Sequence, residues 1–488
     1  MDFVSAVILL FVFYVRPQEW ISVFSAARPL LVAQGFALFA LLIRPGRIQP
    51  RDFFKTPHDW MMLIYWAWIV WTSAESWETF KNLTPLFLIY LFIVQALSTT
   101  RRLMFFFYWW SGFIFLIACL AVASEYGFDP TGSYEMTHGW AKGRLIFNTS
   151  MFDNPNALGH SVAPVIPLIY FLLVWKRPIF VIEAAIPLMV PPLICVYLTQ
   201  SKGSYISGFV AIIAALAFGR PKFVQAIILT LAVTVGWGAM YSLPRFTEIS
   251  KSRSDEALLG RLMSLEFGLR KMETTSTGVG WLKYIPAYQR EDPDHAIASH
   301  NAYNEIGAEL GYTGLFLFVG ILYCCMRSTI TANTSNIDEE RIRRILFMLV
   351  ASFAVSAWVI DFAYRATFFM IVAAVAAFHR TLQEKNPVEK PPESEDFSSF
   401  RAVRSGAGGM LRPTPVEAAA TPVGASANLP PRQLLMPKRP YAVGGGPTGP
   451  EKPPILMAWR RLGILDLILM YIITEQVIQL WKYIIKNF

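Results

Sequence analysis

Charge is scarce in this chain: only 16% of its 488 residues are charged, whereas 54% are hydrophobic. Soluble globular proteins carry about 25% charged residues, so this balance argues against an ordinary soluble enzyme. Cysteine is equally rare, and all four cysteines fall inside apolar runs, where they form neither a disulfide framework nor a zinc-binding spacing: Cys119, Cys195, Cys324 and Cys325. The segment Met1–Val15 has neither the basic start nor the cleavage site of a signal peptide, so it predicts a first membrane span.

Apolar windows long enough to cross a bilayer recur along the first 380 positions. They predict an all-α, polytopic membrane helix bundle with about twelve transmembrane helices. The expected spans lie near 3–15, 29–43, 59–73, 80–97, 103–124, 157–175, 179–199, 203–219, 222–242, 306–326, 344–361 and 363–379.

Lysine and arginine concentrate in alternate loops, as the positive-inside rule requires. These basic residues are Arg44, Arg47, Arg51, Lys55, Arg101, Arg102, Lys176, Arg177, Arg220, Lys222, Arg327, Arg341, Arg343 and Arg344. The pattern predicts that both termini face the cytoplasm and that two long loops, 125–156 and 243–305, face the periplasm. The net charge of +9 is explained by these anchors and by a basic tail. No compact basic domain with interleaved aromatic residues suggests nucleic-acid binding.

The composition changes near Gln383, where proline, glycine, alanine and serine become frequent. Residues 1–382 are the expected transmembrane domain, and residues 383–454 are expected to form a disordered cytoplasmic tail that the chemistry does not require. Residues 455–488 turn apolar again and predict an amphipathic or membrane-associated C-terminal helix. Charged residues interrupt this helix, which favours an interfacial or partner-binding helix over a clean span, with a thirteenth span as the alternative.

The most informative polar cluster is His300-Asn301-Ala302-Tyr303, followed by Glu309-Leu310-Gly311, at the start of an apolar run. Polar groups at the mouth of a membrane helix are costly to desolvate and therefore often mark a functional site. Histidine suits general-base chemistry because its ordinary pKa lies near neutrality. A simple helix start, with Asn301 or Ser299 as its cap, is the structural alternative.

Three further clusters fall on the same predicted side of the membrane. Arg144 precedes the turn Asn154-Pro155-Asn156, which also reads as the cap of the next helix. Lys202 lies in a tight hairpin on the outer side, where a cation suggests an anionic ligand such as phosphate. Arg261 lies in the second long loop, upstream of Gly278-Val279-Gly280, whose glycines would let the backbone approach a ligand closely.

Two cations and a base on one side of a membrane favour a lipid-linked phosphate substrate and an acceptor hydroxyl. No Asp-x-Asp, zinc spacing or Ser-His-Asp order indicates a metal enzyme or a hydrolase. The alternative class is a transporter that only binds a lipid-linked substrate, which would place its charges near the middle of the bilayer.

Four motifs of this chain resemble those of the O-antigen ligase family. They are Asn154-Pro155-Asn156-Ala157-Leu158-Gly159, Ser201-Lys202-Gly203, Arg261 before Gly278-Val279-Gly280, and His300-Asn301-Ala302-Tyr303 with Glu309-Leu310-Gly311 and Gly314. The resemblance covers residues 1–380 in topology and 140–320 in motif, and it does not extend to the tail. It implies a C-type glycosyltransferase of the bacterial inner membrane that needs no cofactor or metal. Such an enzyme transfers a glycan from undecaprenyl diphosphate to a lipid, glycan or protein acceptor.

The resemblance also implies roles for individual residues. His300 would activate the acceptor hydroxyl, and Arg261 would hold the diphosphate. Lys202 stands where the family often has arginine, so it would keep the charge but lose the bidentate geometry. The substrate-binding residues implied in this way are Lys202, Arg144, Asn154, Asn156, Asn301, Tyr303 and Glu309. O-antigen polymerases and protein O-oligosaccharyltransferases share these motifs, so the acceptor stays open.

Overall fold

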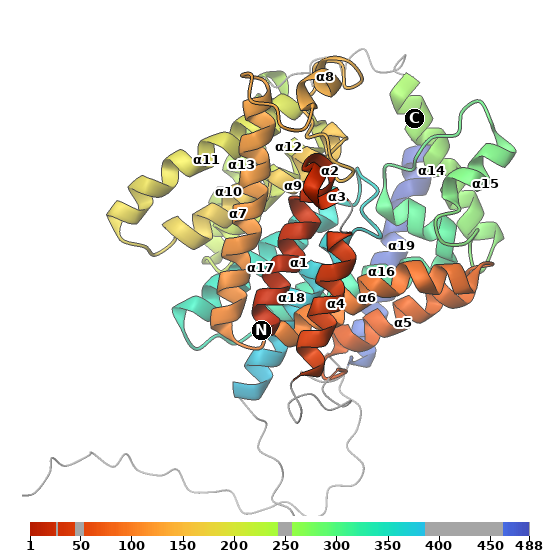
Figure 1. Cartoon of the computed structure of the whole chain (residues 1–488). Helices are drawn as coiled ribbons and strands as arrows, with labels where there is room; N and C mark the ends of the chain where they lie inside the picture. The colour runs from red at the N-terminus through yellow and green to blue at the C-terminus, as the bar shows by residue number, and fades with distance from the viewer. Residues whose placement is uncertain (26–27, 44–52, 243–255, 386–461, 488) are drawn as a thin grey trace, which may run out of the picture. The chain divides into compact units, whose positions relative to one another are not determined.

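The computed structural model describes residues 1–25, 28–43, 53–242, 256–385 and 462–487, and within these ranges it contains helices and no strand (Figure 1). The helices are α1 (Asp2–Tyr14), α2 (Pro17–Trp20), α3 (Ser22–Ser25), α4 (Pro29–Leu42), α5 (Pro57–Thr72), α6 (Ser76–Ala96), α7 (Thr100–Ser124), α8 (Ser133–His138), α9 (Pro155–Val162), α10 (Val165–Ile169), the π-helix η2 (Tyr170–Val174), α11 (Ile179–Thr199), α12 (Lys202–Ala217), α13 (Lys222–Ser242), α14 (Glu256–Thr274), α15 (Tyr284–Glu291), α16 (Ala302–Thr331), α17 (Ile337–Ser356), α18 (Ala366–Lys385) and α19 (Ile464–Asn487).

Every expected span overlaps a helix, which confirms the all-α class. Among the described residues, 8 helices are long and apolar enough to cross a membrane, and they include α19, which was not among the twelve expected spans. The helices α4 and α12 are apolar but shorter, and so is the apolar part of α13, Lys222–Gly236. The expected number of twelve transmembrane helices is therefore not confirmed, although a multi-pass architecture is.

Helices α16 and α18 form the centre of the bundle, since most of their residues are buried. Helix α16 packs against α5, α14, α17 and α19, while α18 packs against α6. By contrast, α11 and α19 expose most of their apolar side chains, as helices at the lipid boundary do.

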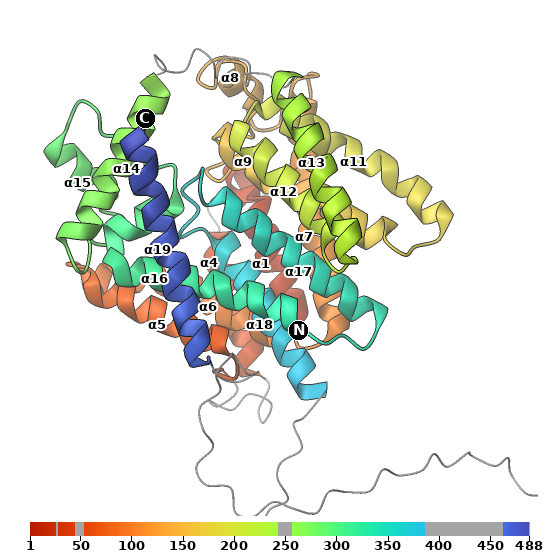
Figure 2. The ribbon, with the colours of Figure 1, turned by 180° about the vertical axis from the view of Figure 1, so that it is seen from behind.

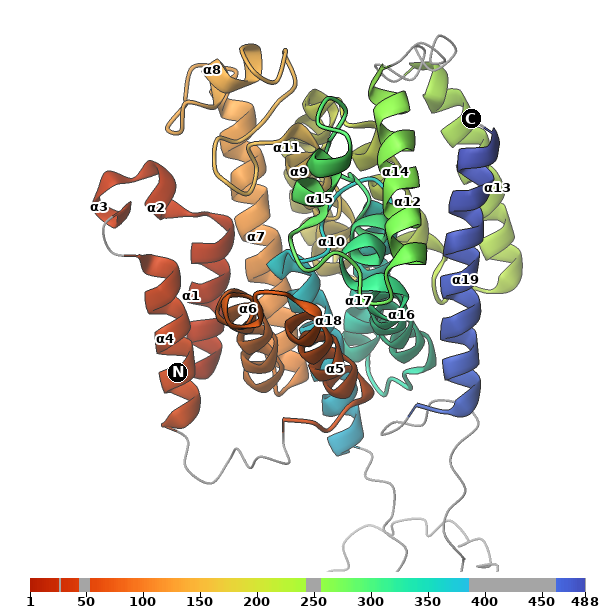
Figure 3. The ribbon, with the colours of Figure 1, turned by 90° about the vertical axis from the view of Figure 1, so that its right-hand side faces the viewer.

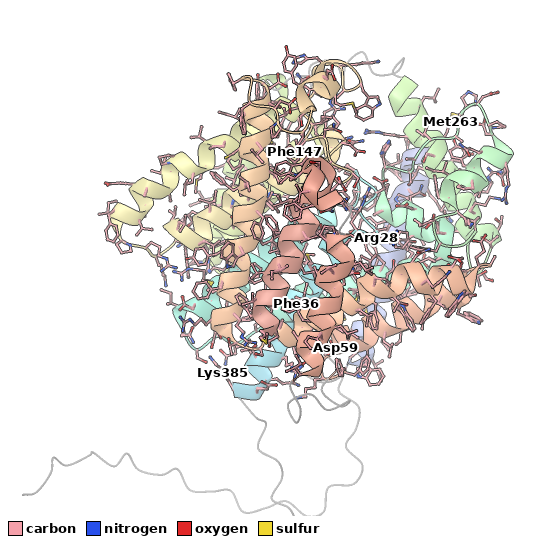
Figure 4. All side chains as sticks on the ribbon, viewed as in Figure 1. Arg28, Phe36, Asp59, Phe147, Met263 and Lys385 are labelled. Atoms are coloured by element: carbon pink, nitrogen blue, oxygen red, sulfur yellow. The ribbon has the colours of Figure 1, made fainter. Side chains whose placement is uncertain are left out.

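The basic loops predicted to share one side of the membrane gather at one end of the bundle. Arg341 donates a hydrogen bond to the carbonyl of Trp175 (3.2 Å). Arg344 donates to the carbonyls of Phe218 (2.5 Å) and Gly219 (3.2 Å). We call this the basic end. Figure 4 shows Lys385 and Asp59 toward this end and Phe147 and Met263 toward the other. Arg44, Arg47 and Arg51 lie outside the described residues.

The opposite end carries the two long segments predicted as periplasmic loops. The first contains the short helix α8. The second is not a loop, because its described part, 256–305, forms α14 and α15 beside the start of α16 (Figure 3). Helix α14 has 19 residues but mixes charged and apolar side chains, which conceals it in a search for apolar spans.

The C-terminal helix α19 packs along α16 and α14, on the face shown in Figure 2. Near its start, Asp466 accepts a hydrogen bond from Tyr323 (2.7 Å). Near its end, Lys482 forms an ion pair with Glu273 of α14 (2.7 Å). These contacts are about 24 Å apart along the helix at 1.5 Å per residue, close to the thickness of a bilayer core.

Helix α19 is long and apolar enough to be a span, which is the alternative left open for residues 455–488. Two of its charged residues, Asp466 and Lys482, contact α16 and α14. That both chain ends face the cytoplasm stays a prediction. The expected tail, 383–454, lies almost entirely outside the described residues.

We expect removal of α19 to destabilise the protein, whereas residues 383–454 are expected to be dispensable. A chain ending at Lys385 loses the contacts of α19 with α14 and α16 and should melt several degrees lower in detergent. A chain lacking only residues 392–452 keeps α19 and serves as the matched control. Equal melting temperatures of the two variants would show that α19 does not stabilise the bundle.

Candidate functional site

A cavity of about 550 Å³ opens at the end of the bundle opposite the basic end. Its lining comes from four parts of the chain: the segment after α8, the start of α9, the α11–α12 hairpin, and the α14–α16 region. The lining residues are Trp140, Ala141, Lys142, Arg144, Asn154, Pro155, Asn156, Gln200, Arg261 and His300. Five of the nine residues singled out from the sequence are therefore brought together: Arg144, Asn154, Asn156, Arg261 and His300.

Arg144 is held in a fixed orientation on the cavity wall. Its Nε donates to the carbonyl of Thr199 (3.1 Å), and its terminal nitrogen donates to Oδ1 of Asn156 (2.8 Å). The Oδ1 of Asn154 accepts from the backbone N–H of Asn156 (2.8 Å) and caps α9, where Pro155 occupies the first turn. Both interpretations of the Asn-Pro-Asn turn are thus compatible: it caps a helix and it lines the cavity.

His300 lies between two opposite charges. Burial lowers the pKa of His300, and the positive charge of Arg261 lowers it further, while the negative charge of Asp361 raises it. The net direction is downward, so the imidazole is neutral at neutral pH and can accept a proton. Asp361 belongs to the turn between α17 and α18, which brings a fifth part of the chain to the site.

Three of the lining residues have left-handed backbone conformations that L-residues rarely adopt: Lys142 (φ 53°), Gln200 (φ 48°) and His300 (φ 47°). Each such residue costs about 1–3 kcal/mol unless the surroundings impose it. Strained residues of this kind cluster at functional sites, and their concentration around one cavity supports its assignment as the site.

The other residues singled out from the sequence do not line the cavity. Lys202 is the first residue of α12, next to the capping residue Ser201. Asn301 caps α16 by accepting from the N–H of Asn304 (3.1 Å), which is the structural alternative stated above. The hydroxyl of Tyr303 donates to the carbonyl of Ala354 (2.9 Å), which joins α16 to α17.

Glu309 is also structural in this arrangement. Its side chain is 1% exposed, and Oε1 accepts from the backbone N–H of Tyr284 at the start of α15 (2.9 Å). A substrate-binding role for Glu309 is therefore not supported, because the carboxylate anchors the segment between α14 and α16 instead. Lys202, Asn301 and Tyr303 also lack a place in the lining, although Lys202 is two residues from Gln200.

The comparison with known families matches one part of the chain. Residues 187–319 match the O-antigen ligase family model. No curated protein matches the chain. The matched segment runs from α11 into α16 and contains Lys202, Arg261 and His300, so the resemblance stated from the motifs is confirmed. Together with the 8 candidate spans among the described residues, the match supports a multi-pass membrane protein.

Several residues of the candidate site come from outside the matched segment. Arg144, Asn154 and Asn156 come from the preceding part of the chain, and Asp361 from the following part. The sequence analysis missed Asp361, as well as Trp140, Lys142 and Gln200 in the lining. Asp361 could have been noticed in the sequence, because it is a carboxylate in the short apolar hairpin between two helices.

The other histidines near this end are poor candidates for the base. His160 is buried inside α9, where Nδ1 contacts the hydroxyls of Ser356 (2.9 Å) and Ser207 (3.0 Å). His295 is exposed and pairs with Asp292 (2.9 Å), but it does not line the cavity. Within the described residues, no group of three histidine, cysteine or acidic side chains could hold a metal ion.

The glycines of Gly278-Val279-Gly280 approach another segment of the chain rather than a ligand. The N–H groups of Val279 and Gly280 donate to the carbonyls of Ala308 and Glu309 (both 2.9 Å). Gly278 and Gly311 both have positive φ (75° and 69°), and the helical path of α16 is interrupted at Gly311. This glycine contact docks the loop after α14 onto α16.

Replacing Gly278 with alanine should destabilise the protein, because the new Cβ would overlap the backbone of Glu309 in a left-handed conformation. We expect a loss of about 1–3 kcal/mol, measured as a lower melting temperature in detergent. Gly127→Ala is the matched control, since Gly127 also has positive φ (92°) but open space around it. Equal effects of the two substitutions would exclude the backbone contact as the cause.

Proposed function

We propose that this chain is a metal-independent glycosyltransferase that moves a glycan from undecaprenyl diphosphate to an acceptor hydroxyl at the periplasmic face of the bacterial inner membrane. The single observation that carries the proposal is the shared cavity of Arg144, Arg261 and His300. The O-antigen ligase match over residues 187–319 supports the same reaction class. The basic loops at the opposite end support the orientation by the positive-inside rule.

The chemistry follows from the charges around the cavity. The neutral His300 imidazole accepts the proton of the acceptor hydroxyl while that oxygen bonds to the anomeric carbon of the donor. The bond between the anomeric carbon and the diphosphate oxygen breaks, and undecaprenyl diphosphate leaves with its electron pair. Arg144 and Arg261 stabilise the negative charge that develops on the diphosphate. The Asp361 carboxylate stabilises the protonated imidazole after the transfer.

The exposed indole of Trp140 and the amides of Asn154 and Gln200 suit a sugar chain, because carbohydrate faces stack on aromatic rings and hydroxyls bond to amides. A transporter is the weaker alternative. Its charges would lie near the middle of the bilayer, whereas these cations line a cavity at one end of the bundle.

The acceptor decides whether the enzyme is a ligase, a polymerase or a protein O-oligosaccharyltransferase, and we favour the ligase. Cells that lack this protein should still assemble long glycan chains on undecaprenyl diphosphate but fail to attach them to their acceptor. The measurement is mass spectrometry of the lipid-linked and surface glycans with and without the gene. Accumulation of single repeat units on the carrier, without long chains, would identify a polymerase instead.

A further inference from the structure

Two further cavities lie on the outer surface of α7, far from the candidate active site. The first has a volume of about 490 Å³ at the basic end and is lined by Thr100, Arg101, Met104, Phe105, Tyr108, Arg177, Asn336 and Asp338. The second, of about 130 Å³, is lined by Tyr108, Ser111, Gly112, Phe115, Ile169, Leu172, Leu173 and Leu188. Tyr108 lines both, so the polar cavity continues into an apolar groove.

The polar cavity favours an anion. Within the described residues, neither Arg101 nor Arg177 forms an ion pair with a carboxylate: Arg101 lies over the ring of Phe105 at 5.6 Å, and Arg177 donates to the hydroxyl of Tyr108 (2.9 Å) and to the carbonyl of Leu172 (3.2 Å). The carboxylate in the lining, Asp338, is already paired with Arg341 (2.6 Å).

Two helix starts add to this positive potential. Thr99 caps α7 by accepting from the N–H of Arg102 (3.2 Å), and Asn336 caps α17 by accepting from Asp338 and Glu339 (3.1 and 2.9 Å). Both helices therefore begin at the polar cavity and direct the positive ends of their dipoles there. The positive charges of Arg177 and Arg341 also repel each other, and an anion between α7 and the 175–177 turn would relieve that repulsion.

The two cavities together have the position and length for a lipid. Their lining residues follow one side of α7 from Arg101 to Phe115, about 21 Å at 1.5 Å per residue, whereas one leaflet of a bilayer core is about 15 Å thick. The apolar groove takes up the part from Tyr108 to Phe115, about 10 Å. A side-chain atom added at Gly112 would meet no other atom within 4 Å, so the groove is open there. The opposite wall is the π-helix η2 and the middle of α11, and π-helical turns frequently occur at functional sites.

We propose that these two cavities together bind one anionic phospholipid from the leaflet at the basic end, with its phosphate between Arg101 and Arg177 and one acyl chain beside Gly112. Basic pockets between membrane helices recognise anionic headgroups in this way. The site is separate from the candidate active site, since the polar cavity lies at the basic end and neither cavity shares a lining residue with that site. It does not depend on the proposed function.

The test is native mass spectrometry of the purified full chain in detergent, titrated with phosphatidylglycerol or phosphatidylcholine of identical acyl chains. Each arginine near a headgroup contributes about fivefold, so we expect the two arginines to make the protein bind phosphatidylglycerol about 25-fold more tightly than phosphatidylcholine. The double variant Arg101→Ala and Arg177→Ala should bring the ratio of the two affinities close to one. Arg220→Ala, at the same end but outside the lining, is the matched charge control.

The groove is tested by Gly112→Trp. The tryptophan should fill the groove and weaken the binding of both lipids at least fivefold. Gly35→Trp, in similarly open space on α4, is the control and should not weaken the binding of either lipid. Melting curves establish folding, and Gly112→Leu replaces the tryptophan variant if that variant unfolds. An unchanged preference in the double arginine variant would overturn the proposal. The proposal would also be overturned if soluble glycerol phosphate competed fully for the site while Gly112→Trp left lipid binding unchanged. The ligand would then be a free phosphate ester.

Discussion

Replacing His300 with alanine should abolish glycan transfer, while protein level and donor binding stay nearly unchanged. His300 is the one histidine that lines the cavity among the described residues, and it lies beside both Arg261 and Asp361. Loss of a general base typically costs about 10² to 10⁴ in rate. The measurement is turnover of a lipid-linked donor by purified, reconstituted enzyme.

Two controls separate chemistry from backbone conformation. His300 has a φ of 47°, which asparagine tolerates better than alanine does, so His300→Asn keeps the loop but not the base. It should be as inactive as His300→Ala. His295→Ala removes an exposed histidine of the same segment and should be fully active. Near-normal turnover in the asparagine variant would remove His300 from the mechanism.

The pH dependence tests the surroundings of the same base. Because burial and Arg261 lower the pKa of His300, the enzyme should keep its activity below the ordinary pKa of histidine and lose it as the pH falls through the lowered value. Asp361 raises that pKa, so Asp361→Asn should lower it and shift the acid limb of kcat/KM to lower pH. A shift to higher pH, or none, would show that Asp361 does not act on the base.

Five of the residues singled out from the sequence line one cavity: Arg144, Asn154, Asn156, Arg261 and His300. They were noticed because polar groups at the ends of apolar runs are conspicuous, and their roles stay predictions. The sequence could not separate a residue that lines a cavity from one that caps a helix, as Asn301 shows, or from a buried anchor, as Glu309 shows. That distinction depends on contacts between segments distant in the sequence.

The helices outside the apolar spans were the harder part. Helix α14 lies in a segment expected as a periplasmic loop, because charges interrupt its apolar face. Charges in α19 likewise favoured an interfacial helix over the further span that its length and composition allow. In the fold these charges find partners on one another's helices, as Lys482 and Glu273 do. Ion pairs between helices make such charges compatible with packing against the bundle. The sequence of one segment does not reveal which partner its charges will find on another helix.

Replacing Arg261 with alanine should weaken use of the diphosphate donor by about tenfold to a hundredfold, the equivalent of one charge-assisted hydrogen bond. Arg261 lines the cavity and its charge acts on His300, so kcat/KM for the donor should fall and donor binding should weaken. Arg270→Ala on the same helix is the matched control, because Arg270 is exposed and pairs with Glu291 (2.8 Å). It should leave both quantities unchanged.

Arg261→Lys distinguishes a bidentate contact from a charge alone. Lysine keeps the positive charge but cannot donate two parallel hydrogen bonds, so it should recover part of the donor binding and only a small part of the rate. Since lysine still carries the charge that lowers the pKa of His300, the acid limb of the pH profile should stay in place, whereas Arg261→Ala should move it to higher pH. If donor binding by Arg261→Ala equals that of Arg270→Ala, then Arg261 is a solvated surface cation, and the diphosphate must be held by Arg144 and Lys142 instead.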